Sequence, residues 1–274
     1  MWGAFGTIIG SFLNVLILRY GKKPITGRSV CPSCKAVLEP YDLIPVLSWI
    51  FLRGRCRYCN AHISIQYPLV ELGTGIAFAL IGVAPIELMF KCLALPIASI
   101  FIAIAVHDLR TTIIPDTWVL LLGALSLVAA ILSVSDGYGS YATVLLAGPL
   151  VALPLGGLWF FSRGTWMGFG DVKLALSIGW LLGIEGGLKA LFLAFILGAL
   201  VSVPLLVFSS EWWKRFRARL TPTAISQIAP WQFKMKSEIP FGPFLVAACF
   251  IVWFAGMYGI TLPIADFGRL FEAS

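Results

Sequence analysis

The chain has 274 residues, of which 59% are hydrophobic and only 12% are charged, and its formal net charge is +7. A soluble domain carries about 25% charged residues, and it could not bury this much apolar surface, so a soluble fold is excluded. The basic residues lie between apolar runs, which disfavours a nucleic-acid-binding protein and indicates the charge pattern of a membrane protein.

Eight apolar runs are long enough, or nearly so, to cross a bilayer as helices, which predicts an all-α polytopic membrane protein. The runs are 2–18, 68–84, 88–106, 117–134, 141–161, 172–184, 187–208 and 241–260. The first run lacks the basic leading segment and the cleavage site of a signal peptide, so we expect a retained helix. The sixth run is short and follows a glycine-rich turn, which suits a partly hydrated functional site.

Basic residues concentrate at one end of the expected helices. The two long loops, 19–67 and 209–239, and the other odd-numbered helix exits hold seventeen of the twenty Lys and Arg residues. Because Lys and Arg mark the cytoplasmic side, both long loops should be cytoplasmic and both termini periplasmic. We therefore expect a first membrane helix (1–18), a cytoplasmic loop (19–67) and a seven-helix membrane domain (68–274).

The first long loop is too small for a hydrophobic core of its own, and four cysteines could stabilise it. Cys31 and Cys34 form one C-x-x-C pair, and Cys56 and Cys59 form a second after 21 intervening residues. Two such pairs close a tetrahedral four-sulfur site of the kind that Zn²⁺ prefers, although this spacing exceeds the usual range by one residue. Disulfides are the alternative, but they are rare in the cytoplasm. His62 could replace one ligand, although the four thiolates already complete a zinc site.

Two aspartates at cytoplasmic helix ends are the strongest candidates for chemistry. Asp108 ends the third expected helix, and Asp171 opens the sixth directly after Gly168-Phe-Gly170, whose glycines would allow close backbone approach. Two facing carboxylates at low dielectric constant share one proton, which supplies a base to activate water and an acid to polarise a carbonyl. The alternative is that both aspartates cap helix ends or pair with Arg110 and Lys173.

A third carboxylate, that of Asp116, lies in the same segment as Asp108. Pro115 disfavours a continuous helix between the two. Asp116 should therefore precede the fourth helix, where its carboxylate can cap backbone N–H groups from Thr117 onward. Asp108 has no such local role, so we expect Asp108 and Asp171 to form the catalytic pair, with Asp116 as structural support.

These motifs resemble those of the prepilin peptidases, the type IV leader peptidases of type IV pilus and type II secretion systems. The resemblance covers nearly the whole chain. Besides the two C-x-x-C pairs, it rests on these segments: Gly10-Ser-Phe-Leu-Asn14-Val-Leu-Ile-Leu-Arg19, Ile44-Pro45-Val-Leu-Ser48, Tyr67-Pro-Leu-Val-Glu71, Asp108, Ile114-Pro115-Asp116, Gly168-Phe-Gly170-Asp171 and Ile239-Pro240-Phe241-Gly242-Pro243-Phe244.

The resemblance implies a bacterial inner-membrane protease that cleaves the basic leader of type IV prepilins and pseudopilins after a glycine, on the cytoplasmic side. It also implies N-methylation of the new N-terminal residue, usually Phe, with S-adenosylmethionine as donor. Asp108 and Asp171 would then be catalytic, supported by Asp116, Gly168, Gly170 and Lys173. Glu71 and Asn14 are polar within apolar runs and could serve packing or a second site; Glu71 is the candidate for methyl transfer.

Two other functions fit part of the pattern. A transporter or channel could bind a cation with paired carboxylates, but it predicts inverted repeats, and we find no convincing internal repeat. A presenilin-like protease of unrelated substrates shares the Gly-x-Gly-Asp element but would not explain the cysteine loop. The expected partners are therefore the lipid bilayer and membrane-embedded prepilins, without nucleic acid.

Overall fold

The computed structural model describes residues 1–21, 24, 26–135, 140–209 and 240–262, so most of the second predicted loop lies outside the described residues. Within them the chain is all-α, as predicted, with two isolated β-bridges and no strand. The elements are α1 (Trp2–Arg19), η1 (Pro40–Leu43), α2 (Leu47–Phe51), α3 (Gln66–Val83), α4 (Leu88–Thr111), α5 (Asp116–Ser135), α6 (Tyr141–Ser162), α7 (Phe169–Ser209) and α9 (Gly242–Met257).

Six described helices are long and apolar enough to cross a membrane, namely α1, α3, α4, α5, α6 and α7, and α9 is a shorter apolar helix. The multi-pass membrane character predicted from composition is therefore confirmed. The sixth and seventh expected runs both lie in α7, which is interrupted at Gly183 by backbone angles of φ 73° and ψ −177°.

The break in α7 turns the chain back on itself. A Cβ atom at Gly187 would lie 3.3 Å from the Cα of Gly179, whereas residues eight apart in a straight helix are separated by about 12 Å. Element α7 therefore consists of two arms, 169–182 and 184–209, which correspond to two of the predicted runs. Glycine is needed at position 183 because its positive φ disfavours any residue with a side chain.

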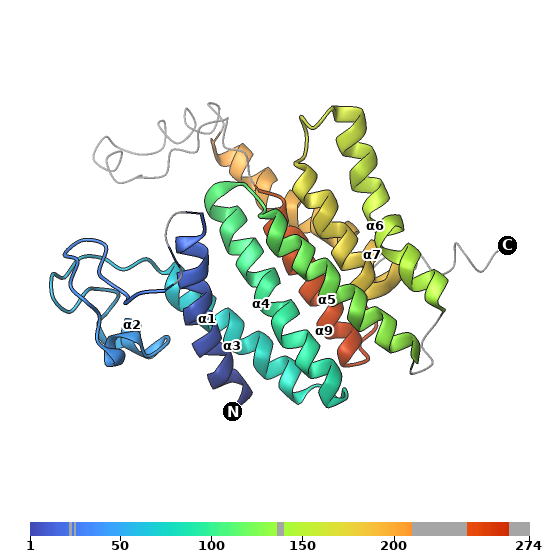
Figure 1. Cartoon of the computed structure of the whole chain (residues 1–274). Coiled ribbons are helices and arrows are strands. Elements are labelled where there is room, and N and C mark those ends of the chain that lie inside the picture. Colours follow the sequence, from blue (N-terminus) through green and yellow to red (C-terminus); the bar gives the residue numbers. More distant parts are fainter. Residues whose placement is uncertain (22–23, 25, 136–139, 210–239, 263–274) are drawn as a thin grey trace.

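Successive membrane helices run in alternating directions (Figure 1). The end of α1, the turn between α4 and α5, and the beginnings of α7 and α9 gather at one end of the bundle. The N-terminus and the turn between α3 and α4 lie at the opposite end. The alternation is the one expected from the basic residues, and the assignment of the first end to the cytoplasm stays a prediction.

Small residues bring the helices into close contact. A Cβ atom at Gly10 of α1 would lie 2.6 Å from the Cα of Glu71 in α3, and one at Gly179 of α7 would lie 2.5 Å from the carbonyl oxygen of Ala147 in α6. In a bilayer such close packing replaces the hydrophobic effect as a source of helix association. The largest buried side chains of the core are Phe78, Ile81, Ile97, Phe101, Ile104, Leu122, Leu155, Leu174, Ile178 and Leu245.

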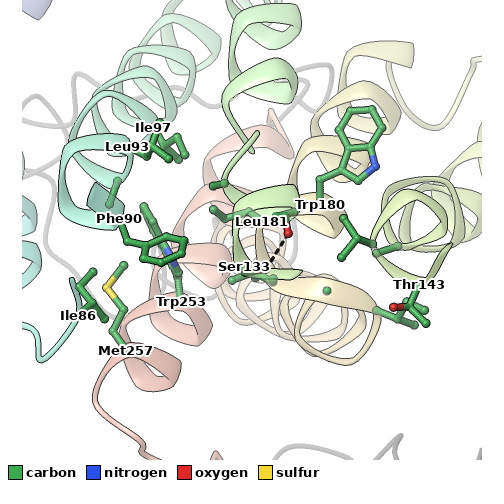
Figure 2. A pocket seen from close by; sticks show the side chains of 18 residues that line it. Ile86, Phe90, Leu93, Ile97, Ser133, Thr143, Trp180, Leu181, Trp253 and Met257 are labelled. Carbon is green, nitrogen blue, oxygen red and sulfur yellow. Dashed lines mark hydrogen bonds between the residues drawn. The ribbon is translucent and has the colours of Figure 1, made fainter. Parts of the chain in front are cut away.

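A cavity of about 500 Å³ lies toward the end of the bundle that holds the α3–α4 turn, between α4, α5, α6, α7 and α9. Figure 2 shows its mainly apolar wall. Two polar groups in that wall already have partners: the Trp180 indole N–H donates to the carbonyl of Leu145, and the Ser133 hydroxyl donates to the carbonyl of Ala130. None of the residues predicted from sequence to carry chemistry lines this cavity.

Candidate active site

Asp108 lies in the last turn of α4 and is buried, with 4% of its surface exposed. Thr112 ends the helix in the left-handed conformation, with φ 54°, and its N–H donates to the carbonyl of Asp108 at 2.8 Å. The neighbouring His107 is also buried, and its Nδ1 lies 2.9 Å from the carbonyl oxygen of Ile113. These contacts fix the point at which the chain leaves α4, one turn after Asp108.

Asp171 lies in the first turn of α7 and is 7% exposed. Its backbone N–H donates to the carbonyl of Gly168 at 3.2 Å. Its Oδ1 atom is buried, and among the described residues it has no hydrogen-bond partner. An unbonded buried carboxylate oxygen is costly, so this oxygen adds nothing to the stability of the fold through hydrogen bonding.

The two aspartates lie close enough for their carboxylates to interact electrostatically. The glycine before Asp171 is part of this approach, because a Cβ atom at Gly170 would lie 3.0 Å from the Cβ of Ile114. Ile114 also packs against Gly242, the first residue of α9. The pair is therefore enclosed by α4, α7 and the start of α9.

Asp116 forms an ion pair instead of the predicted helix cap. It is the first residue of α5, and its carboxylate lies 2.7 Å from the Nζ atom of Lys173. In the first turn of α5, the N–H groups of Trp118 and Val119 donate to the carbonyl of Pro115. A capping side chain must stand just outside the helix, and Asp116 is already inside it. The ion pair links the start of α5 to α7, next to Asp171.

The cations near the two buried aspartates are engaged elsewhere. Lys173 bonds Asp116, and the Arg110 guanidinium donates to the side-chain oxygen of Gln66 at 2.8 Å. The alternative in which Asp108 and Asp171 serve as ion-pair partners of Arg110 and Lys173 therefore does not hold. The helix-cap alternative holds for Asp108 in part. Its carboxylate caps the start of α9 instead of an end of its own helix, α4.

Gly242 is the residue of this site to which sequence analysis gave no role. Its backbone N–H donates toward the Asp108 carboxylate, and a Cβ atom at this position would lie 2.5 Å from Oδ2 of Asp108. The available signal was the sequence Pro240-Phe241-Gly242-Pro243, in which a glycine stands between two prolines at the start of an apolar run. That pattern predicts a helix start, but it does not indicate which distant side chain will contact it.

The four loop cysteines converge on one point. Their sulfur atoms all lie within 4.8 Å of one another, and none forms a disulfide. Cys31 and Cys56 are buried, whereas Cys34 and Cys59 are exposed. His62 is not in the group. The arrangement fits a four-thiolate metal site and not the pair of disulfides considered as its alternative.

The two C-x-x-C turns share one backbone conformation. The N–H of Cys31 donates to the carbonyl of Ala36, and the N–H of Cys56 donates to that of Ala61, both at 2.9 Å. Each turn is closed by an isolated β-bridge, Val30 with Val37 and Arg55 with His62. The bridge places His62 beside Arg55, which explains why it stands outside the sulfur cluster.

The charges of the four thiols depend on one another. A bond from the backbone N–H of Cys34 lowers the pKa of Cys31 to about 6. The pKa of Cys59 is raised to about 12: the Ala61 N–H acts in the opposite direction, but removal from water and contacts with the other thiols outweigh it. Four sulfurs within 4.8 Å of one another cannot all ionise without a nearby cation, and a metal ion at this position would supply that positive charge.

Comparison with known proteins identifies the family. A sequence model of the bacterial peptidase A24 N-terminal domain matches residues 4–84, and one of the type IV leader peptidase family matches residues 95–203. The chain belongs to the type IV leader peptidase family. The first match contains the cysteine loop and Glu71, and the second contains Asp108, Asp116 and Asp171. No solved structure matches the chain significantly.

Three relatives illustrate the match, and each is named prepilin leader peptidase/N-methyltransferase. The protein of Xanthomonas campestris pv. campestris is 32% identical over 282 residues, which cover 92% of this chain and 89% of the relative. That of Aeromonas hydrophila is 30% identical over 291 residues, covering 94% and 90%. That of Bacillus subtilis is 32% identical over 203 residues, covering 72% and 78%.

Glu71, the methyl-transfer candidate of this leader peptidase, lies where the loop meets the membrane helices. It is 7% exposed, and its Oε2 accepts a hydrogen bond from the backbone N–H of Val46 at 2.7 Å. Val46 precedes α2 with a positive φ of 61°. Nearby, Asn14 of α1 donates to the carbonyl of Tyr67, while its buried Oδ1 has no partner among the described residues. A buried polar cluster thus joins α1, α3 and the loop.

Proposed function

We propose that this chain cleaves the leader peptide of type IV prepilins and pseudopilins and methylates the new N-terminus. The observation that carries the proposal is the pair of buried aspartates, Asp108 and Asp171, one of which has an unbonded carboxylate oxygen. A prepilin is a membrane helix whose polar leader leaves the bilayer at one end. The scissile bond therefore lies where the leader leaves the bilayer, and a carboxylate pair at the ends of membrane helices can reach it there.

Cleavage requires one ionised and one protonated carboxyl group. The ionised group takes a proton from water, and the water oxygen bonds to the carbonyl carbon while the protonated group gives its proton to the carbonyl oxygen. In the second step the carbon–nitrogen bond breaks, the amine nitrogen takes a proton, and the carbonyl re-forms. The Asp116–Lys173 ion pair and the close contacts at Gly170 and Gly168 support the position of Asp171.

We also propose that the cysteine loop binds one Zn²⁺ through Cys31, Cys34, Cys56 and Cys59. The mutual distances of the four sulfurs and the shifted pKa values of Cys31 and Cys59 support a divalent cation at this position. A zinc ion with four sulfur ligands has no open coordination position, so its role would be structural. The ion would hold the loop in shape against the membrane helices.

The methyl donor would be S-adenosylmethionine, which supplies a methyl group from a positively charged sulfonium. The buried acceptors Glu71 and Asn14 suit a cation, because one is a carboxylate and the other has an unpartnered amide oxygen. Glu71 also bonds the loop through the N–H of Val46. Its contribution to methylation would thus include the placement of the loop.

In the cell, we propose that the chain lies in the bacterial inner membrane with the aspartates and the zinc loop on the cytoplasmic side and both termini in the periplasm. The first helix, the loop 19–67 and the membrane domain from residue 68 onward would be its three parts. The positions of the basic residues support this orientation. Cation transport is not favoured, since the family is a peptidase family.

The decisive experiment uses the full chain in lipid nanodiscs with a prepilin and isotope-labelled S-adenosylmethionine. Mass spectrometry of the pilin product should show loss of the leader and a labelled methyl group on the new N-terminal residue. A product with an intact leader in the presence of folded enzyme would contradict the proposed cleavage. A cleaved but unlabelled product would contradict the methyl transfer alone.

A further inference from the structure

The first turn of α9 leaves one backbone donor for an outside acceptor. The residue before the helix, Phe241, makes no side-chain capping bond, and Pro243 has no N–H group. The N–H groups of Phe244 and Leu245 both donate to the carbonyl of Phe241, at 3.1 and 3.2 Å. The N–H of Gly242 is therefore available, and such groups at helix starts require a partner.

Asp108 supplies that partner from a helix far away in the sequence. The Gly242 N–H donates toward its carboxylate, and a Cβ atom on Gly242 would lie 2.5 Å from Oδ2 and 3.3 Å from Cγ of Asp108. Even an alanine methyl group would force the carboxylate to move. The contact therefore depends on glycine at position 242, and the N-terminus of a helix favours a negatively charged partner.

Asp171 has no comparable contact. It lies in the first turn of its own helix, which favours an anion, but its Oδ1 receives no hydrogen bond within the described part of the chain. A direct bond to a carboxylate contributes more than the helix dipole alone. When the two residues share one proton, the negative charge is therefore better placed on Asp108 and the proton on Asp171.

We propose that Gly242 is a positioning residue that keeps Asp108 ionised as the base of the reaction. Asp108 then takes the proton from water as the water oxygen bonds to the scissile carbonyl carbon. Asp171 gives its proton to the carbonyl oxygen, so that one proton enters and one leaves the pair. This inference rests on the proposed protease function and assigns the two roles which that function leaves open.

The two described cations that flank the buried aspartates in sequence, Arg110 and Lys173, already have other partners. On the elements packed around it, the described ionisable groups near this end are Asp171, Lys173, Asp116, Arg110, His107, Tyr20, Arg19, Tyr67 and Glu71. Lys173 bonds Asp116, and Arg110 bonds Gln66. Among these described groups, Asp171 is the one that shares the buried site and interacts electrostatically with Asp108. A change in pH dependence on altering Gly242 would therefore report on this pair.

The test compares Gly242→Ala with Gly256→Ala, a matched change on the same helix where an added Cβ meets no atom within 4 Å. Cleavage of a purified prepilin by the full chain in nanodiscs is measured across pH. Gly242→Ala should lower kcat on the order of 10²-fold with little change in KM. The acidic limb of its kcat/KM profile should move up by about one pH unit, because a bond to the ionised group is lost. Gly256→Ala should match the wild type.

A second variant removes the donor without adding an atom. Glycolic acid incorporated at position 242 by nonsense suppression replaces the N–H with an ester oxygen and should give the same shift of the acidic limb. A shift of the basic limb instead would reverse the roles of Asp108 and Asp171 and overturn the proposal. An unchanged profile for the ester would overturn it as well. Failure of the proposed function is distinguishable, because the wild-type chain would then cleave no prepilin at any pH.

Discussion

The carboxylates of the three aspartates in the candidate site have different surroundings. Asp108 contacts a backbone N–H, Asp171 has an unbonded buried oxygen, and Asp116 is an exposed partner of Lys173, with 67% of its side chain accessible. An exposed ion pair contributes no more than about 1 kcal/mol. Only the first two residues have the burial and proximity that acid–base chemistry requires.

Asparagine at position 108 or 171 should abolish cleavage, because an amide cannot exchange the proton. We expect a loss of about 10³-fold or more for Asp108→Asn and for Asp171→Asn. Asp116→Asn removes only an exposed ion pair, so the rate should fall by less than about 5-fold. Initial rates of prepilin cleavage give the comparison, with thermal unfolding as the check on folding. An active Asp108→Asn variant beside an inactive but folded Asp116→Asn variant would reverse the assignment.

The residue scale also shows what sequence could and could not predict. Asp108 and Asp171 were identifiable because charged residues are rare in membrane helices and therefore stand out. The partner of Asp116 was not identifiable, because the Lys173 contact depends on how α5 packs against α7. The contact of Gly242 with Asp108 also joins two helices, and no local pattern encodes it.

At the scale of elements, the cysteine loop is organised by its two matching turns and by contacts that join them. The Arg57 side chain bonds Asp42 at 2.7 Å and lies 4.9 Å from the ring centre of Tyr41, linking the second turn to η1. The Trp49 indole N–H donates to the carbonyl of Ile63. With so little hydrophobic core, the loop would depend on the proposed metal ion for much of its stability.

Removing two cysteines should remove the metal. The double substitution Cys31→Ser and Cys34→Ser leaves two thiolates, too few for a closed site, so zinc should fall from one ion per chain to none. Elemental analysis of protein purified without chelator measures this. Cys92→Ser is the control, since Cys92 is an exposed helix residue outside the cluster. Wild-type protein that contains no metal under these conditions would refute the zinc assignment.

The contact between Glu71 and the loop predicts that the two activities can be separated. Glu71→Ala removes both the charge and the acceptor for the Val46 N–H, whereas Glu71→Gln removes only the charge. We expect both variants to lower methylation by about 10-fold or more, with alanine the more severe, because a lost bond to a charged group costs about 1.5–3 kcal/mol. Cleavage should depend on the two aspartates instead of Glu71, so it should fall much less.

Two assays on the same preparations test this separation. Methylation of pre-cut pilin reports on the Glu71 site, and cleavage of full-length prepilin reports on the aspartates. A Glu71 variant that loses cleavage but still methylates pre-cut pilin at the full rate would contradict the division.

Short elements were the least predictable from sequence. The apolar runs predicted the membrane helices because twenty or so apolar residues have few other structures available. Helix α2 has only five residues and begins after Val46, whose positive φ is unfavourable for a β-branched residue. Its start is held by the carboxylate of Glu71 on α3, so the conformation depends on a contact made only in the folded protein.

At the scale of the whole molecule, the two parts of the chain meet at one end of the bundle. The hydroxyl of Tyr20, which follows α1, lies 3.0 Å from that of Thr117 in α5, and the Tyr20 ring packs edge-on against His107 and Trp118. His107 directly precedes Asp108. The first helix and the loop it carries are therefore in contact with the segment that bears the aspartates, which is compatible with two reactions on one substrate end.

The orientation in the membrane can be tested by labelling engineered cysteines in cells with a membrane-impermeant maleimide. The basic residues predict that the loop and the α6–α7 turn lie in the cytoplasm. Glu87→Cys and Glu185→Cys, both exposed at the opposite end, should react in cells with a permeabilised outer membrane. Glu39→Cys and Arg163→Cys should react only after the inner membrane is opened.

Cys92→Ser is the required background, because Cys92 is exposed near the end of α4 that should face the periplasm. Reaction of Glu39→Cys from outside would place the cysteine loop in the periplasm, and it would remove the aspartates from the side where the leader peptide lies.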